Sequence, residues 1–232
     1  MNRPVTPESV LSNDDPGDDI QRRFRYQNTY AAIISLSLLK ENSKADCIFC
    51  EQHEDVLVKQ KDDTFVGIQI KTRDSKKPYQ ASDEAIIKSL KRFIKLETQF
   101  QGKFSQYVIA VNNGFWQDRK NTNNLPYLLE LAKSVIEEGI VPHKSISSFA
   151  QKICSNDKAL SGVVLNSDEA ISNLALSVLG KVTLDEKLPG LDDIHERLIK
   201  EISQLPNMTQ RGGGLPFHRT HRKLFLSRLA RY

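Results

Sequence analysis

The spacing of hydrophobic residues changes several times between residues 18 and 111, and the order of these changes restricts the possible folds more than any other feature. Apolar residues recur at every third or fourth position over 18–40 and 82–100, which predicts two amphipathic helices. Four short segments rich in β-branched or aromatic residues predict strands: 46–51, 55–60, 64–72 and 104–111. The order helix, three strands, helix, strand predicts a mixed α/β core.

The rest of the chain is predicted to be mainly helical. The helices are expected near 126–138, 145–154, 168–179 and 191–204. We therefore divide the chain into a flexible N-terminal segment (1–17), the α/β core (18–120), a helical extension of the same domain (121–206) and a basic region (207–232). A predicted helix over 223–231 reaches the last residues, so we expect the natural protein to continue beyond Tyr232.

The composition is that of a water-soluble domain. A chain of 232 residues, 39% of them hydrophobic, can bury a full core as one domain. Its longest apolar run, 31–39, is too short to cross a bilayer, and the first twenty residues lack the features of a secretory signal. Three cysteines do not suggest a disulfide framework. We predict a reduced, cytoplasmic protein that does not contact a membrane.

Polar residues gather on one face of the predicted strand 64–72. Side chains two residues apart share a strand face, so Gln69 and Lys71 point the same way while Ile70 turns into the core. Gly67 lies on the same face and leaves space above it. If 55–60 and 64–72 form a hairpin, Asp55 lies near Gln69 and Lys71.

An acid, an amide and a lysine at one place suggest phosphodiester chemistry. Mg²⁺ prefers oxygen ligands, which Asp55, Gln69 and the carbonyl of Ile70 would supply, and Mn²⁺ is the alternative ion. Lys71 would favour an attacking hydroxide or stabilise the charge that develops at phosphorus. This short pattern also fits a half-exposed strand with polar residues on its solvent face.

Several blocks of the sequence resemble one family. These blocks are GDDIQRRFRYQNTYAA (17–32), CEQHEDVLV (50–58), TFVGIQIKTR (64–73), SLKRFIKLETQF (89–100), NNGF (112–115) and KVTLDEKLPGLDDIHERL (181–198). They resemble the nuclease domain of CD-NTase-associated effectors, which act in cyclic-oligonucleotide anti-phage systems (CBASS), and the resemblance covers most of residues 17–205. The element order with Asp…(E/Q)xK resembles the wider PD-(D/E)xK nuclease superfamily.

The resemblance implies a restriction-endonuclease-like αβββαβ core with a C-terminal helical extension. It also implies a magnesium-dependent double-stranded DNA endonuclease that forms a homo-oligomer on activation. In that family a SAVED domain that binds a cyclic oligonucleotide follows the nuclease domain. The present sequence has no room for that sensor, so we expect either a following sensor domain or a separate partner such as a HerA-type ATPase.

The resemblance also assigns roles to individual residues. Asp55 matches the metal-binding acid, Gln69 the (E/Q) position and Lys71 the lysine. Tyr26-Gln27 matches the first-helix pair whose polar member, here Gln27, faces the site. Gln69 stands where most of the superfamily has an acid, which implies weaker metal binding in the absence of DNA.

Other polar residues near the motif leave alternatives open. Glu51 and Glu54 are further candidate ligands, but neighbouring strand residues face opposite ways, so Glu54 is not expected to act together with Asp55. Cys47 and Cys50 with His53 resemble part of a zinc site, although small buried hydrophobic residues explain the two cysteines better.

Basic residues gather in three places. They lie on the first helix (Arg22, Arg23, Arg25), on the second helix (Lys88, Lys91, Arg92, Lys95) and in 207–232. Each group either contacts nucleic-acid phosphates or forms a solvated, ion-paired surface, and the sequence favours neither. The leading hypothesis is a DNA endonuclease of an anti-phage defence system. The alternatives are a non-catalytic module that binds DNA or assembles with a translocase or sensor subunit, and a nuclease that acts on RNA.

Overall fold

The computed structural model describes residues 16–40, 42–118, 123–154 and 168–204. Most of the segment predicted to be flexible (1–17) and the whole basic region (207–232) lie outside these residues. Within the described part, no helix combines the length and the hydrophobicity needed to cross a membrane.

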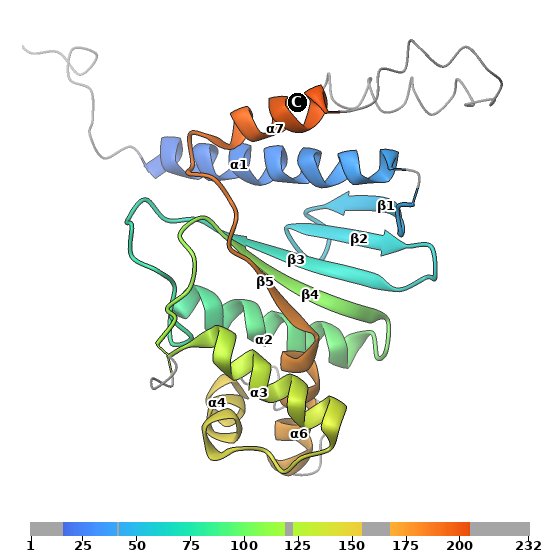
Figure 1. Ribbon diagram of the computed structural model, residues 1–232, viewed down its shortest axis with the longest axis vertical. Helices are drawn as coiled ribbons and strands as arrows, with labels where there is room; N and C mark the ends of the chain where they lie inside the picture. The colour runs from blue at the N-terminus through green and yellow to red at the C-terminus, as the bar shows by residue number, and fades with distance from the viewer. Residues whose placement is uncertain (1–15, 41, 119–122, 155–167, 205–232) are drawn as a thin grey trace, which may run out of the picture.

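A five-stranded mixed sheet forms the centre of the molecule (Figure 1). Its strands lie side by side in chain order: β1 (Ala45–Cys50), β2 (Val56–Gln60), β3 (Phe65–Lys71), β4 (Phe104–Val111) and β5 (Val182–Asp185). The first three strands are antiparallel, whereas β4 runs parallel to β3 and β5 runs parallel to β4. The central strand β3 is buried between β2 and β4, which holds its side chains in fixed directions.

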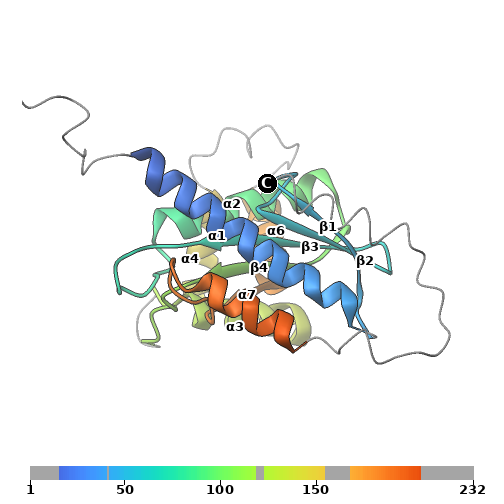
Figure 2. The same ribbon diagram turned by 90° about the horizontal axis from the view of Figure 1, so that it is seen from above.

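One face of the sheet is covered by α1 (Pro16–Leu36) and α7 (Ile194–Ser203), which lie side by side in both views (Figures 1 and 2). A short 3-10 helix, η2 (Ser37–Leu39), follows α1. Tyr26 and Tyr30 of α1 pack here against side chains of β2 and β3 such as Val56 and Ile68. This layer therefore packs the first and the last helix of the described chain against each other.

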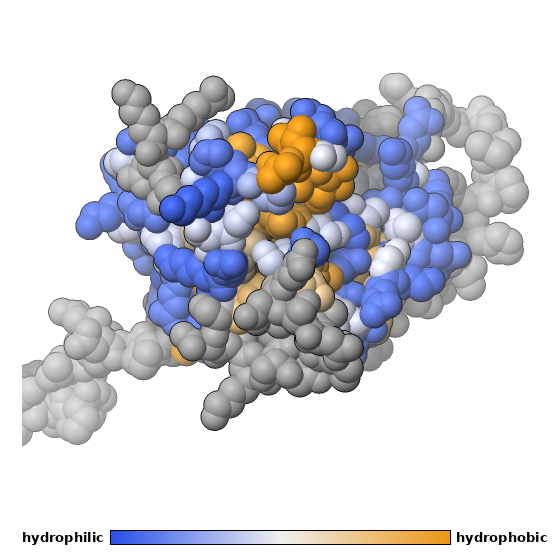
Figure 3. Space-filling view, turned by 90° about the horizontal axis from the view of Figure 1, so that it is seen from below, coloured by the Kyte–Doolittle hydropathy of each residue, from blue (hydrophilic) through white to orange (hydrophobic). Residues whose placement is uncertain are grey.

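The opposite face is covered by α2 (Glu84–Gln99), α3 (Leu125–Glu138) and α6 (Asp168–Lys181), and α4 (Lys144–Cys154) packs against these helices. Leu90 and Phe93 of α2 belong to a second core with Tyr107 of β4. The far surface of this layer is mainly hydrophilic with a hydrophobic patch (Figure 3). The sheet therefore separates two hydrophobic cores.

The observed order α1-β1-β2-β3-α2-β4 confirms the predicted αβββαβ core, and the fold is restriction-endonuclease-like with helices following the core. One element differs from the sequence prediction, because 182–185 form a strand within the part expected to be helical. Four residues are too few to show a period in the sequence. Val182 is buried, and the pairing of β5 with the edge of β4 makes this segment a strand.

Candidate active site

Asp55, Gln69 and Lys71 meet at one end of the β2–β3 hairpin, as the sequence predicted. Gln69 and Lys71 lie on β3, and Asp55 immediately precedes β2. The Oδ2 atom of Asp55 accepts a hydrogen bond from the backbone N–H of Ile70 at 2.7 Å. The carboxylate thus caps β3 where the ladder with β2 has ended, and this fixes its position relative to Gln69 and Lys71.

The amide group of Gln69 connects the acidic and the basic side of the cluster. Its side chain is buried, with 4% of the residue exposed. The amide nitrogen donates to Oδ1 of Asp55 at 3.3 Å and to Oε2 of Glu54. The amide oxygen accepts from Nζ of Lys71 at 2.6 Å. Two carboxylates and one ammonium therefore converge on a single neutral side chain.

Glu54 belongs to the cluster, which corrects the expectation that it would face away from Asp55. Strict alternation places neighbouring side chains on opposite faces, but it holds only within a strand. Residues 51–55 form bends between β1 and β2, so Glu54 is free to turn toward Gln69. The residue is 1% exposed, and its Oε1 atom is buried with no hydrogen-bond partner in the described structure.

Gly67 provides the room for the Glu54 side chain. A Cβ atom at this position would lie 3.3 Å from Cγ of Glu54 and 3.3 Å from Cδ1 of Tyr107, which is closer than most real contacts. The space that the sequence analysis expected above Gly67 is therefore present, and Glu54 fills it. A larger residue at position 67 would push the carboxylate away from Gln69.

Burial shifts the pKa of both ionisable groups that Gln69 contacts most closely. It raises the pKa of Glu54 to about 8. The positive charges of Arg92 and Lys71 and the hydrogen bond from Gln69 oppose this shift, because they favour the charged form. Burial lowers the pKa of Lys71, and the nearby carboxylates of Asp55 and Glu54 oppose that shift. In the absence of a cation, burial thus disfavours charge on both groups.

Arg92 of α2 reaches the cluster from the neighbouring helix. Its Nε atom lies 3.4 Å from Oε2 of Glu54 and donates to the carbonyl oxygen of His53 at 2.7 Å. The imidazole ring of His53 in turn makes an edge contact with Phe100 at 5.1 Å between ring centroids. The segment 51–55 is therefore held along the second half of α2.

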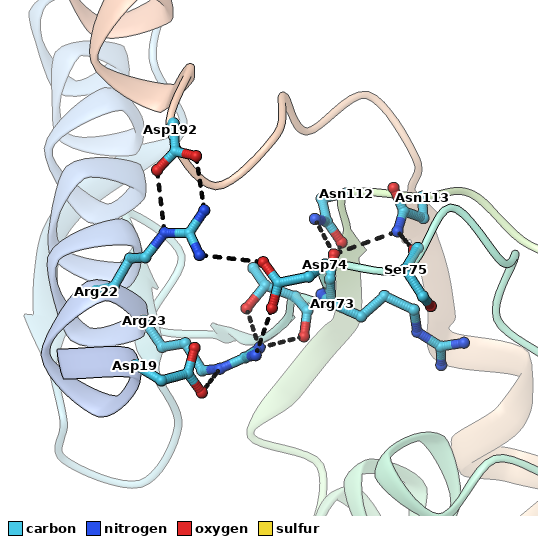
Figure 4. A network of polar contacts seen from close by, with 10 residues as sticks. Asp19, Arg22, Arg23, Arg73, Asp74, Ser75, Asn112, Asn113 and Asp192 are labelled. Atoms are coloured by element: carbon cyan, nitrogen blue, oxygen red, sulfur yellow. Dashed lines mark hydrogen bonds and ion pairs between the residues drawn. The ribbon is translucent and has the colours of Figure 1, made fainter. Parts of the chain in front are cut away.

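A network of ion pairs holds the loop that follows Lys71 (Figure 4). Arg23 of α1 donates to the carbonyl oxygen of Thr72 at 2.6 Å and also pairs with Asp19 and Asp74. Arg22 joins Asp74 to Asp192 at the start of α7, with contacts of 3.1 Å and 2.6 Å. For these two arginines the structure favours the ion-paired interpretation over contact with phosphates.

Gln27, which the resemblance places at the site, does not join the hydrogen-bonded cluster. Gln27 is half-buried on α1, which covers the opposite face of the sheet, and it takes no part in the bonds that join Asp55, Gln69 and Lys71. Its role at the site stays a prediction, as does the carbonyl of Ile70 as a ligand. Glu51 is exposed, with a left-handed φ of 56°.

The cysteines differ from the expectation of small buried residues. Cys50 is exposed and Cys47 is half-buried, and both are free thiols on the edge strand β1. Within the residues that the structure describes, no group of three or more His, Cys, Asp or Glu side chains is arranged to hold a metal ion. In the described part of the chain, Glu54 and Asp55 are therefore not joined by a third His, Cys, Asp or Glu side chain in an arrangement that could hold a metal ion.

Sequence reasoning did not find the two residues that complete the cluster. The sequence predicts a strand that begins at Asp55, one residue too early, and this prediction places Glu54 and Asp55 on opposite faces. Arg92 stands out in the sequence only as one of several cations on the second helix, because its contact with His53 joins residues 39 positions apart. The adjacent acids in His53-Glu54-Asp55 were the available signal for the first.

A family model matches most of the chain. The family described as "Cap4, dsDNA endonuclease domain" matches residues 15–211. That range begins just before α1 and includes every strand and helix described above. Comparisons with curated proteins and with solved structures gave no match.

Proposed function

Because the chain belongs to the Cap4 dsDNA endonuclease domain family, and is therefore a DNA endonuclease domain, we propose that it hydrolyses phosphodiester bonds at Glu54, Asp55, Gln69 and Lys71 with a divalent cation. The observation that carries the proposal is the position of the Gln69 amide. The amide nitrogen donates hydrogen bonds to two carboxylates, and the amide oxygen accepts one from the ammonium group of Lys71.

The donor atoms of the cluster fit a hard divalent cation. Mg²⁺ takes oxygen ligands and commonly uses one or two carboxylates, as Mn²⁺ also can. Asp55, Gln69 and the carbonyl of Ile70 are the proposed ligands, and Glu54 adds a buried oxygen that has no hydrogen-bond partner. A buried carboxylate oxygen without a partner is costly, and a cation would satisfy it. When bound, the cation would supply positive charge to the phosphate and favour ionisation of the attacking water.

Gln69 would have to turn its amide group to coordinate the cation. Its oxygen now faces Lys71, and its nitrogen faces the carboxylates. Turning the amide would place the oxygen beside Asp55 and Glu54. The same movement would remove the acceptor of Lys71, because the amide nitrogen can only donate. We propose that Lys71 is then free to contact the scissile phosphate.

Lys71 has two proposed roles, and both follow from its position. As an ammonium it would stabilise negative charge that develops on the phosphate oxygens. Because burial lowers its pKa, it also gives up a proton more readily than a surface lysine does and can exchange one with the attacking water. Both roles require that the backbone of Lys71 stays at the end of β3, so that its amine lies beside Gln69.

A cleavage assay with plasmid DNA tests the proposal. With Mg²⁺ present, Lys71→Ala should reduce cleavage by roughly 100-fold or more, because a group that stabilises transition-state charge is lost. Lys200→Ala removes an exposed lysine of α7, on the other face of the sheet, and should cut like the unmodified protein. Equal cleavage by the Lys71→Ala protein would contradict the assignment.

The same assay distinguishes the other interpretations. DNA binding that survives Asp55→Ala, in a protein that does not cut, would favour a non-catalytic module that partners a translocase or a sensor. Cleavage of RNA in preference to DNA would change the substrate class. We propose that the domain acts in anti-phage defence, forms a homo-oligomer on activation, and responds to a cyclic-oligonucleotide sensor domain or a HerA-type ATPase.

A further inference from the structure

The basic residues of α2 lie on one exposed face of the helix. Successive residues are about 100° apart around a helix, so Lys88, Lys91, Arg92 and Lys95 fall within an arc of about 100°. The residues that α2 buries lie on the remaining circumference: Ile86, Ser89, Leu90, Phe93, Ile94, Leu96 and Glu97. We call the four basic residues the α2 cationic face.

The α2 cationic face adjoins the candidate active site. Arg92 belongs to it and also contacts Glu54 and the carbonyl oxygen of His53. Gln69 and Lys71 project from β3 on the side of the sheet that α2 covers, as the packing of Gly67 against Glu54 and Tyr107 shows. A polymer that runs along this face therefore passes beside the cluster.

Among the side chains of α2 on this arc the charge is mainly positive, while Glu54 and Glu51, which precede β2, interact with Arg92. Glu84 is the acidic residue on the same arc of α2, and it pairs with Lys88 at 2.6 Å. Both side chains are highly exposed, at 73% for Lys88 and 81% for Glu84, so this pair contributes little to stability. Lys88 can therefore exchange Glu84 for a phosphate at low cost. Glu97 is buried and paired with Lys181 on the opposite side of the helix.

The dimensions also fit a nucleic-acid backbone. From Lys88 to Lys95 the helix extends about 10 Å, at a rise of about 1.5 Å per residue. One strand of duplex DNA presents a phosphate about every 3.4 Å along its axis, so this length spans about three phosphates. A single small anion would use only one of these side chains.

We infer that the α2 cationic face binds the phosphate backbone of double-stranded DNA beside the bond that is cut. The inference rests on the proposed function, because the cluster at Gln69 marks where the backbone must pass. Contacts of this kind position the duplex without reading its sequence. Binding by this face is therefore independent of sequence and strongly dependent on salt.

The test measures DNA affinity over a series of salt concentrations. The double variant Lys88→Gln/Lys95→Gln leaves Arg92 in place, because Arg92 also holds Glu54. Binding of a short fluorescent duplex is followed in chelator, so that no cleavage occurs. The plot of log affinity against log salt should become shallower by about 2, since each lost phosphate contact contributes about 0.9. Lys187→Gln/Lys200→Gln removes two exposed lysines near α7 and should keep the original slope.

Three results would each overturn the inference. The first is an unchanged slope in the α2 variant, and the second is an equal loss of slope in the control. The third is DNA binding by the unmodified protein that does not depend on salt. These outcomes are separate from failure of the proposed function. Cleavage by the unmodified protein together with unaltered binding by the α2 variant would reject only the surface. Weaker binding by the α2 variant, with equal cleavage by the Lys71→Ala and unmodified proteins, would reject only the site.

Discussion

The Glu54 carboxyl group experiences opposing electrostatic effects. Burial raises its pKa to about 8, while Arg92 and the hydrogen bond from Gln69 favour its charged form. A folded-state pKa above the usual 4.5 means that the folded protein keeps a proton that the unfolded chain releases between about pH 4.5 and 8. Stability should therefore be greatest below this window and fall as the pH rises through it.

Replacing Glu54 by Gln should remove this dependence in metal-free protein. Over the window, the unfolding free energy of the unmodified protein should fall by up to about 1.4 kcal/mol per pH unit more than that of the Glu54→Gln protein. Urea denaturation in chelator at several pH values measures the difference. The matched substitution Glu130→Gln, on an exposed part of α3, should behave like the unmodified protein. Parallel pH profiles for the Glu54→Gln and unmodified proteins would refute the expectation.

At the scale of elements, α1 and α7 fix the loop that leads from β3 to α2. Arg23 donates a hydrogen bond to the carbonyl oxygen of Thr72, the residue directly after Lys71. Arg22 forms ion pairs with both Asp74 and Asp192. The backbone N–H of Arg73 is held in addition by Oδ1 of Asn112. The end of the strand that carries the candidate lysine thus depends on helices of the other layer.

Replacing Arg23 by Gln should loosen residues 72–76 without unfolding the domain. The loss of the hydrogen bond to Thr72 should lower the free energy of local opening by about 1 kcal/mol, which makes amide exchange about fivefold faster. Hydrogen–deuterium exchange of a peptide that covers this loop measures the effect. Lys59→Gln breaks a surface ion pair with Asp63 at the other end of the hairpin and serves as the control. Unchanged exchange in the Arg23→Gln protein would show that other contacts hold the loop.

At the scale of the whole molecule, a largely buried polar cluster joins α2, β4 and α6. Glu97 accepts hydrogen bonds from the hydroxyl of Tyr107 at 3.0 Å and from Nζ of Lys181 at 2.8 Å. The backbone N–H of Gly102 also donates to it, at 3.3 Å. Glu97 and Lys181 are 84 positions apart, so the cluster ties the core to the helices that follow it.

Removing one member of the Glu97–Lys181 pair should destabilise the protein more than replacing both members. Glu97→Leu removes the acceptor of the Tyr107 hydroxyl and the carboxylate that pairs with Lys181, which keeps only its hydrogen bond to the carbonyl oxygen of Phe104. The variant should lose about 3 kcal/mol of stability. The double variant Glu97→Leu/Lys181→Met should recover part of that loss, because it leaves no unpaired charge. Urea denaturation of the unmodified protein, Glu97→Leu, Lys181→Met and the double variant gives the four unfolding free energies of a double-mutant cycle. Purely additive effects would contradict the predicted coupling.

The sequence alone determined the order of the core elements and the direction of the β3 side chains. The helical and alternating periods are local properties, so residues 18–111 indicated the αβββαβ order without any tertiary information. The same alternation placed Gln69 and Lys71 together and Ile70 in the core, and the structure confirms both. The hairpin connection was short enough to bring Asp55 close to them.

Only the tertiary structure decided which other residues join the site. Glu54 turns toward Gln69 because the chain leaves strand geometry at a bend. The adjacent acids Glu54 and Asp55 are visible in the sequence, but the bend that brings both to the site is not. Arg92 and Arg22 acquire their roles from partners 39 and 170 positions away, and a local pattern carries no signal for such pairings. The strand β5 likewise exists because β4 offers it an edge. Local periods are set by neighbouring residues, whereas contacts between distant segments are set by how the layers pack.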